Sequence, residues 1–547
     1  MCGIYFYIGD GSTREDYRIF EAKCICMIKR RGPDKQSFLD LDKVRVYSSV
    51  LWLQGEDVVE QPKSTEDHLL MWNGDVFKYD DTQLASGSSD TDFIFSKLSE
   101  CRTDNEVINV FQSIQGPWAC VFWDKKKNIL WFGRDFFGRQ SLLIHQSKIG
   151  LILSSVTPTD ETFKFNEVRA DGIYKLNLHH PTDKPVLFPW DCLPQDGYEP
   201  ELTGFSLSCP VRLISNNPEK VNLNPTLDPE LVLETLLLNP VIDIIVSELL
   251  HQLMEAVRIR IELQPGRCKD CIQFAEKCDH PCVGVLFSGG LDSAVLALLA
   301  ATILKQENRS LDLLNVAFGG TESCFQVPDR STGLQALQEM RENLPGFSFR
   351  LVEINIDKTE LQRVRKETIL DLLNPLNTVL DDSIGSAIWF AAQGSGKVEG
   401  KDYLSPCRVL LAGMGIDEQL GGYSRHRSRF LREGLPGLED ELRMELLRIS
   451  ERNLGRDNRI VSDHGVAARF PFLDENVVSY LSSLDTEIKC NLNLPRGIGE
   501  KLVLRLAAHK LGLVKTAREP KRAVQFGSRI AKLENKKEKG ADLAVRD

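Results

Sequence analysis

The sequence has 547 residues, enough for two or three domains with cores of their own. Apolar residues make up 42% and charged residues 27%, as in ordinary globular proteins, and a net charge of -11 disfavours a general role in binding nucleic acid. No segment approaches the roughly 20 uninterrupted apolar residues of a membrane span, and no signal-peptide pattern opens the chain, so we expect a cytoplasmic protein without a membrane partner. The sequence leaves the oligomeric state open.

The first third of the chain, to about residue 185, is predicted to be mostly β. Short apolar runs separated by turn residues predict the strands, and two stretches of helical character lie between them. This mixture favours a layered α/β sandwich. The predicted strands cover 3–8, 69–72, 119–123, 129–132 and 151–154, and the predicted helices cover 21–28 and 91–98.

Cys2 stands at the position where removal of Met1 would make it the first residue. Its thiol would then lie beside a free α-amine whose ordinary pKa of about 8 suits a general base. Attack of such a thiol on an amide gives a tetrahedral oxyanion, then a thioester and ammonia. The alternative is that Met-Cys-Gly is only the start of a strand.

Three further motifs carry groups that such a reaction needs. Arg31 opens an Arg-Gly-Pro-Asp turn and offers a guanidinium to a carboxylate. Asn73 and Gly74 follow an apolar strand and can supply oxyanion donors, and Asp90 opens a helix with an acid able to take an ammonium group. Each motif alone is more simply explained as a solvated turn.

In this order the motifs resemble the class II glutamine amidotransferase domain, over most of residues 2–185. The resemblance implies an αββα-type N-terminal-nucleophile fold with Cys2 as the nucleophile and Asn73 and Gly74 as the oxyanion hole. It implies glutamine binding by Arg31, Asp75 and Asp90. Two departures stand out: Asp75 replaces the usual Glu, and Val-Leu-Trp-Leu-Gln at 50–54 replaces the usual Arg-Leu stretch.

The remainder of the chain changes pattern twice. Prolines crowd 186–239, which is predicted to be a linker or irregular excursion. From 240 to 530 apolar strands alternate with helical stretches, which predicts a parallel, doubly wound sheet. The Lys- and Glu-rich end, 531–547, is predicted to be a charged tail.

The loop Ser288-Gly289-Gly290-Leu291-Asp292-Ser293 follows a predicted buried strand and precedes an Ala/Leu-rich helix. Its glycines let backbone N–H groups approach phosphate oxygens, and the helix N-terminus adds positive potential. Ser288 and Ser293 offer hydroxyls, and Asp292 a carboxylate for Mg²⁺. The loop resembles the pyrophosphate-binding loop of ATP pyrophosphatases; the alternative is a glycine turn capped by Ser.

Two later residues complete a nucleotide site in outline. Asp417 follows a short strand and a glycine turn and can supply a second Mg²⁺ ligand. Lys521 can bind phosphate. The alternatives are that Asp417 only caps a helix and that Lys521 is a solvated surface lysine. A cysteine group at 268, 271, 278 and 282 has partial metal-knuckle spacing, and free thiols are favoured there over a zinc site.

Taken in order, these pieces resemble the synthetase domain of asparagine synthetases, over 240–530. The resemblance implies ATP and Mg²⁺ as cofactors, adenine near Val316, and transfer of ammonia from glutamine to aspartate in asparagine biosynthesis. The family's Gly-Glu-Gly reads Gly-Met414-Gly here, and Asp381 and Asp382 stand near the place of an aspartate-binding arginine. The alternatives are a different carboxylate acceptor, or a non-catalytic scaffold or regulatory relative.

Overall fold

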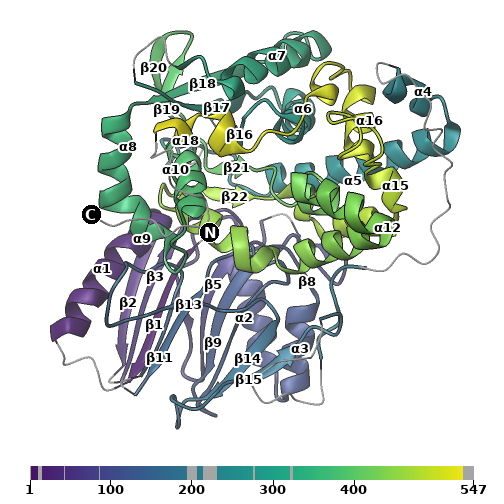
Figure 1. The fold of residues 1–547 in the computed structure, drawn as a ribbon. Coiled ribbons are helices and arrows are strands. Elements are labelled where there is room, and N and C mark those ends of the chain that lie inside the picture. The colour runs from purple at the N-terminus through teal and green to yellow at the C-terminus, as the bar shows by residue number, and fades with distance from the viewer. Residues whose placement is uncertain are drawn as a thin grey trace.

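The computed structural model describes residues 2–9, 15–41, 43–85, 87–148, 150–193, 206–212, 231–274, 278–320 and 325–533. Figure 1 shows two domains, one above the other. The lower domain, purple to blue, carries two facing sheets, and the upper domain, teal to yellow, carries one sheet with helices around it. Within the described ranges, no helix combines the length and apolar character needed to cross a membrane.

Two six-stranded sheets form the body of the lower domain. The first has the order β13 (Asn166–Glu167), β11 (Leu143–Ser147), β12 (Gly150–Ser154), β1 (Cys2–Gly9), β3 (Val44–Val50), β2 (Lys35–Leu41). The second has the order β15 (Val186–Pro189), β14 (Gly172–Asn177), β10 (Ile129–Arg134), β9 (Trp118–Asp124), β5 (His68–Gly74), β4 (Lys63–Ser64). A small sheet joins β7 (Thr82–Gln83), β6 (Lys78–Tyr79) and β8 (Ile114–Gln115).

Alternation along the strands explains the layering. Ile4 and Phe6 of β1 pack in one buried cluster with Met71 and Val121 of the facing sheet, because successive strand residues point to opposite faces. The opposite faces pack beneath α1 (Glu15–Arg31) on one side and α2 (Asp90–Glu100) and α3 (Asp104–Gln112) on the other. The predicted αββα architecture is confirmed.

The upper domain is built on a seven-stranded sheet. Its order is β20 (Lys401–Leu404), β19 (Ser395–Val398), β18 (Phe349–Ile356), β17 (Leu311–Phe318), β16 (Val283–Leu286), β21 (Val409–Leu411), β22 (Ala467–Arg469). The five strands from β18 to β22 in this order are parallel, and β19 and β20 add an antiparallel edge. The predicted doubly wound parallel sheet is confirmed.

Helices cover both faces of this sheet. The helix α6 follows β16 directly, and 12 of its residues are buried, so it is apolar on nearly every side. The helix α5 starts at Pro240 behind an Asn239 cap. The helices are α4 (Val232–Leu237), α5 (Pro240–Glu262), α6 (Leu291–Gln306), α7 (Pro328–Asn343), α8 (Lys358–Val364), α9 (Leu370–Leu373), α10 (Val379–Gln393), α11 (Ile416–Gln419), α12 (Ser424–Leu447), α13 (Gly455–Ser462), α14 (Glu475–Ser483), α15 (Thr486–Lys489), α16 (Leu502–Lys510), α17 (Val524–Gly527) and α18 (Ile530–Leu533).

Ordered elements lie beside each of the expected boundaries at 185, 240 and 530. Strand β15 pairs with β14 as far as Pro189, at the edge of the sheet where a proline is tolerated. Helix α4 precedes residue 240 and packs against α5 and α16, and α18 crosses 530. The remainder of the expected linker, 194–205 and 213–230, and of the tail, 534–547, lies outside the described residues.

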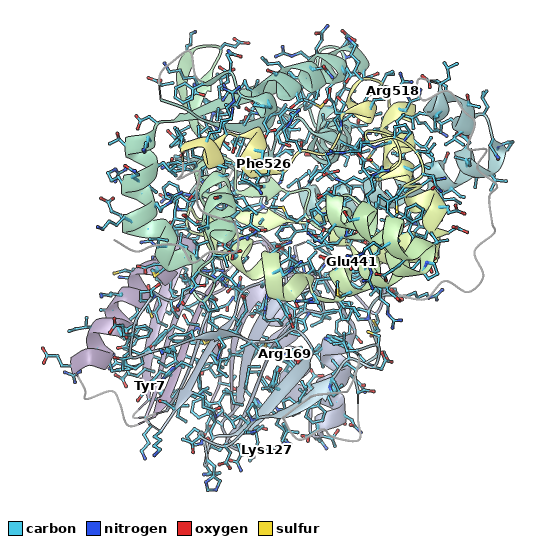
Figure 2. All side chains as sticks on the ribbon, in the orientation of Figure 1. Tyr7, Lys127, Arg169, Glu441, Arg518 and Phe526 are labelled. Carbon is cyan, nitrogen blue, oxygen red and sulfur yellow. The ribbon has the colours of Figure 1, made fainter. Side chains whose placement is uncertain are left out.

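Side chains fill the junction between the two domains, where Figure 2 labels Arg169 and Glu441 on its lower and upper sides. The polar contacts there are unusually rich in buried arginine. These contacts join Arg31 to Asn458, Arg139 to Glu475, Arg408 to Asp34, Arg459 to Glu167, and Arg469 to Asp75. Four of these five arginines meet an acid across the junction, and breaking such a buried pair is strongly destabilising.

Candidate functional site

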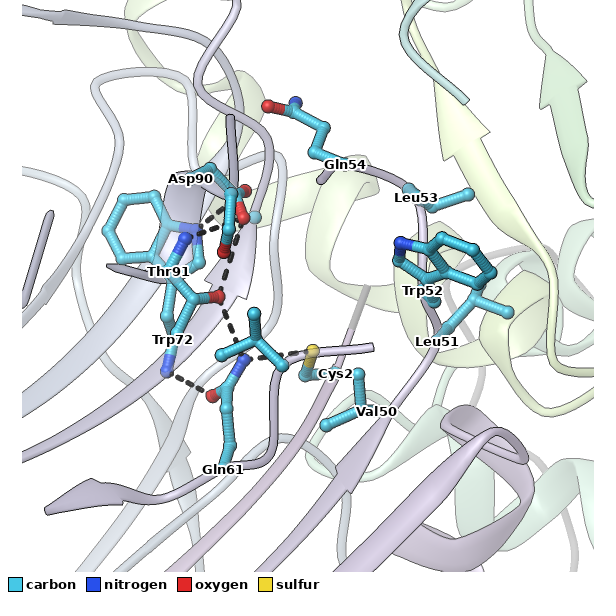
Figure 3. Close-up of a pocket in the computed structure, with 13 residues that line it drawn as sticks. Cys2, Val50, Leu51, Trp52, Leu53, Gln54, Gln61, Trp72, Asp90 and Thr91 are labelled. Carbon is cyan, nitrogen blue, oxygen red and sulfur yellow. Dashed lines mark hydrogen bonds between the residues drawn. The ribbon is translucent and has the colours of Figure 1, made fainter. Parts of the chain in front are cut away.

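A small pocket opens beside Cys2 (Figure 3). Strand β1 of the first sheet brings Cys2 to it, and β5 of the second sheet brings Trp72 and Gly74. The start of α2 supplies Asp90. The lining residues are Cys2, Val50, Leu51, Trp52, Leu53, Gln54, Val59, Gln61, Trp72, Gly74, Ser89, Asp90 and Thr91.

Asn73 holds the backbone nitrogen of Cys2. That nitrogen donates to Asn73 Oδ1 over 2.8 Å, and Asn73 itself is fully buried. The amide nitrogen Nδ2 of Asn73 is buried with no hydrogen-bond partner. A buried donor without a partner costs free energy, so its retention next to the thiol indicates a place for an acceptor atom. Gly74, the next residue, lines the pocket, and a Cβ there would fall 2.5 Å from the carbonyl oxygen of Pro117, so close packing requires glycine.

The thiol of Cys2 is held from the other side by Gln61, a residue that the sequence motifs did not indicate. Gln61 Nε2 donates to Cys2 Sγ over 3.2 Å, and Gln61 Oε1 accepts from the backbone of Trp72 over 2.7 Å. Burial raises the pKa of the Cys2 thiol to about 11. The sulfur is therefore a neutral thiol at rest and requires a base to become a nucleophile.

Asp90 lies across the pocket as a buried acid. Its Oδ2 accepts from Trp72 Nε1 over 3.1 Å, and its Oδ1 accepts from the backbone of Thr91 over 2.7 Å. Burial, and then the charge of Asp75, raise the pKa of Asp90 to about 6. The group is placed to bind a cation once ionised.

Asp75 does not lie in the pocket, contrary to its expected part in glutamine binding. Its carboxylate pairs with Arg469 of β22 through Oδ1 over 2.8 Å and Oδ2 over 3.1 Å. Both side chains are almost fully buried, at 1% and 0% exposed. Gln54 Nε2 also donates to Asp75 Oδ1. A carboxylate held by a two-point ion pair has little capacity left for a substrate ammonium.

Arg31 also lies outside the pocket, contrary to its expected part in binding the substrate carboxylate. Its Nη2 donates to Asn458 of the upper domain over 2.8 Å, and Nε and Nη1 are buried without a hydrogen-bond partner. Burial lowers the pKa of Arg31 to about 9. The described residues that line the pocket include no lysine or arginine. In the lining stretch 50–54, every residue except Gln54 is apolar.

The second expected site lies in the upper domain, at the carboxyl end of β16. Gly289 has a φ of +76°, and a Cβ there would fall 2.2 Å from the backbone nitrogen of Gly333. Gly290 has open space beside it, with only Ser288 Oγ at 3.4 Å from a Cβ. Ser293 Oγ donates to the carbonyl of Gly290 over 3.1 Å. Conformation and close packing therefore require glycine at position 289, whereas the space beside Gly290 is open.

Asp292 and Asp417 are brought together by two lysines. Lys501 Nζ contacts Asp292 at 2.7 Å and Asp417 at 2.6 Å, and Lys521 pairs with Asp417 and lies 3.8 Å from Asp292. The two lysines lower the pKa of Asp417 against its burial. A Cβ on Gly422 would fall 1.8 Å from Asp417 Oδ1, so bare backbone is needed there. Lys501 was not indicated by any sequence motif.

The charges of these two acids and two lysines show whether the site suits the expected Mg²⁺. Two carboxylates and two ammonium groups cancel, so a bare divalent cation gains little at Asp292 and Asp417. A magnesium–phosphate group fits better, because carboxylates offer oxygen ligands to the metal and lysines offer donors to phosphate. The residues present fit Mg²⁺ together with a polyphosphate.

The other residues singled out by sequence have definite positions. Val316 is buried in β17. Met414 packs partly buried against the large core, and a Cβ on its neighbour Gly413 would lie 3.1 Å from Asp292 Cβ. Asp381 pairs with Arg456, and Asp382 with Arg365. The arginines largely neutralise the charge of these two acids.

Comparison with known families agrees with the two domains. A model of the glutamine amidotransferase domain matches residues 1–180, and a model of asparagine synthase matches 278–437 and 431–538. The chain is therefore a two-domain protein of the glutamine amidotransferase and asparagine synthase type.

Curated relatives extend over the whole chain. Asparagine synthetase domain-containing protein 1 of Bos taurus is 38% identical, covering 100% of this chain and 98% of its own. An asparagine synthetase domain-containing protein of Drosophila melanogaster is 33% identical and covers 99% of both chains. One of Saccharomyces cerevisiae is 28% identical, over 98% of this chain and 93% of its own. The chain belongs to the family of asparagine synthetase domain-containing proteins.

Proposed function

We propose that this protein is a glutamine-hydrolysing, ATP-dependent amidotransferase of the asparagine synthetase type. The observation that carries the proposal is the arrangement around Cys2. Asn73 holds the Cys2 nitrogen with its oxygen and keeps its buried amide nitrogen unpartnered, while Asp90 waits across the same pocket. This is the set that amide hydrolysis by an N-terminal thiol requires.

In the proposed first half-reaction, removal of Met1 makes the Cys2 nitrogen an α-amine. The amine takes the thiol proton while Sγ attacks the amide carbon of glutamine, and Asn73 Nδ2 stabilises the oxyanion that forms. Collapse of this intermediate breaks the C–N bond, the nitrogen leaves as ammonia with the transferred proton, and water then hydrolyses the thioester. Asp90 binds the α-ammonium of the substrate. The α-carboxylate finds no arginine in the pocket, so it relies on weaker donors such as Gln54.

In the proposed second half-reaction, a substrate carboxylate attacks the α-phosphorus of ATP and displaces pyrophosphate. Ammonia then attacks the acyl carbon and AMP leaves. The loop 288–293 would hold the pyrophosphate, with Lys501 and Lys521 as donors to it and adenine near Val316. When bound through Asp292 and Asp417, Mg²⁺ neutralises charge on the phosphates.

The family resemblance assigns aspartate as the acceptor, which would make asparagine from aspartate. One observation favours a second candidate, an amidotransferase with a different carboxylate acceptor. Met414 stands in the loop beside Asp292, and its thioether can neither carry charge nor transfer a proton. Pyrophosphate release measured with aspartate and with other acidic amino acids separates the two candidates.

Replacing Cys2 with alanine is expected to abolish ammonia release from glutamine, because no other described thiol lines the pocket. The measurement is ammonia and glutamate formation by the purified chain, after intact mass has shown that Met1 is absent. Cys26→Ala removes an exposed cysteine of α1 and should keep full activity. Undiminished hydrolysis by the Cys2→Ala variant, or a wild-type protein that retains Met1, would contradict the proposal.

Glutamine hydrolysis is expected to fall as the pH drops below about 6. Burial and then the charge of Asp75 raise the pKa of Asp90 to about 6, and only the ionised carboxylate pairs with the substrate ammonium. The measurement is kcat/KM for glutamine against pH, which reports groups of the free enzyme. Asp90→Asn should be weak at every pH and lack this inflection. A wild-type profile that stays flat across this range would show that Asp90 does not bind the substrate.

A further inference from the structure

The structure gathers four metal-ligating side chains between α5 and β16, away from both sites described above. They are Cys268, Cys271, Cys278 and His280, whose ligand atoms all lie within 4.8 Å of one another. The group differs from the one that the sequence indicated, since His280 takes the place of Cys282. His280 Nδ1 lies 3.6 Å from Cys268 Sγ and 3.4 Å from Cys271 Sγ.

These separations match those of ligands around one tetrahedral metal ion. Zinc binds sulfur at about 2.3 Å and imidazole nitrogen at about 2.0–2.1 Å, so tetrahedral geometry sets neighbouring S and N ligands about 3.6 Å apart. The two S···N distances lie at or just under this value.

The surrounding backbone has the form of a metal-binding turn. The backbone N–H of Cys271 donates to the carbonyl of Cys268 over 3.2 Å, so a tight turn presents both sulfurs on one side. The N–H of Cys268 donates to Cys278 Sγ over 3.3 Å. Such a donor stabilises a thiolate, the form that binds a metal. In the sequence, Arg267 and Lys269 flank the first cysteine.

We propose that Cys268, Cys271, Cys278 and His280 bind one structural Zn²⁺. Binding replaces three thiol protons, which are released to solvent, by three S–Zn bonds, and Nδ1 of neutral His280 gives the fourth bond. All four positions are filled by protein, so the ion has no open position for catalysis. The set Cys-x2-Cys-x6-Cys-x-His closes within 13 residues.

The position of the ion explains what it would stabilise. Cys282 follows directly and leads into β16, which carries the loop 288–293. On the other side, Arg267 stacks over Trp52 at 4.7 Å from the ring centroid, and Trp52 lines the Cys2 pocket. The zinc-bound loop would therefore brace the wall of the first pocket and the strand below the second site.

Zinc content of the purified, untagged, full-length chain tests the proposal. We expect about one zinc per chain in the wild type, and a fall to background in Cys271→Ser and His280→Ala. Cys282→Ser is the control for the ligand set, since Cys282 is a neighbouring cysteine outside it. Cys192→Ser is a second control, because Asp191, Cys192 and Cys209 form another group of possible metal ligands. Both control variants should keep their zinc.

A second measurement does not depend on the folding of variants. Wild-type protein stripped of metal is titrated with Co²⁺, and a tetrahedral thiolate spectrum that saturates at one cobalt per chain supports the site. Reduced wild type with neither zinc nor this spectrum would overturn the proposal, as would a disulfide among these cysteines in the native protein. Loss of zinc in Cys282→Ser with retention in His280→Ala would overturn the ligand set. Activity plays no part in these readouts, so the site stands or falls independently of the proposed reaction.

Discussion

Arg469→Met is expected to lower the free energy of unfolding by about 3–5 kcal/mol, because it leaves Asp75 as a buried carboxylate without its partner. Asp75 is 1% exposed, and both of its oxygens accept from Arg469. Arg469 also donates to the carbonyls of Arg260 and Leu263. The substitution therefore affects both domains and their junction together.

Urea unfolding followed by tryptophan fluorescence measures the Arg469→Met effect. Arg363→Met is the control, since Arg363 pairs with Glu360 at 53% and 41% exposure, and exposed pairs contribute at most about 1 kcal/mol. The double variant Asp75→Leu/Arg469→Met should recover much of the loss, because no unpaired charge remains buried. Equal stability of the Arg469→Met and Arg363→Met proteins would show that the buried pair does not hold the junction.

Gly289→Ala is expected to lower the stability of the protein, and Gly290→Ala is expected to lower its affinity for ATP. At Gly289 an alanine must adopt a φ of +76° with its Cβ 2.2 Å from the Gly333 nitrogen. Both effects destabilise, by at least about 2 kcal/mol together. At Gly290 the backbone is ordinary, with a φ of -71°, and the new methyl meets only Ser288 Oγ at 3.4 Å. That variant should fold normally.

The methyl of Gly290→Ala would occupy the space proposed for phosphate. We expect ATP affinity to fall at least about tenfold, since a misplaced methyl costs about 1–3 kcal/mol. Thermal melting and titration with a non-hydrolysable ATP analogue separate the two effects. A Gly290→Ala protein that binds the analogue as tightly as wild type would exclude the loop 288–293 from nucleotide binding, and unchanged melting of Gly289→Ala would show that the loop relaxes.

Local patterns were enough to predict much of the fold. The apolar runs of β1 and β5 indicated strands, and the sequence Phe-Ser-Gly-Gly-Leu-Asp-Ser after β16 indicated a tight loop and a helix start. These signals are local because backbone sterics and side-chain alternation act over a few residues. Strand β15 was not predicted, because it lies in the proline-rich stretch that begins at residue 186.

The partners of the charged site residues were beyond local reasoning. Asp75 has the sequence neighbours of a glutamine ligand, yet Arg469, 394 positions later, takes its carboxylate. Arg31 turns toward Asn458 in the other domain. Asp292 and Asp417 were expected to bind Mg²⁺, and the fold also brings Lys501 into contact with both of them. The sequence also pointed to Cys282, where folding brings His280 to the other cysteines.

The order of residues by itself determined the two fold types, the thiol at position 2 and the glycine loop, because each depends on backbone preferences and side-chain types within a short window. Only the tertiary structure decided which charges face a pocket and which are neutralised. The reason is that a buried ionic group must find its counterion wherever the packed chain supplies one, regardless of separation along the sequence.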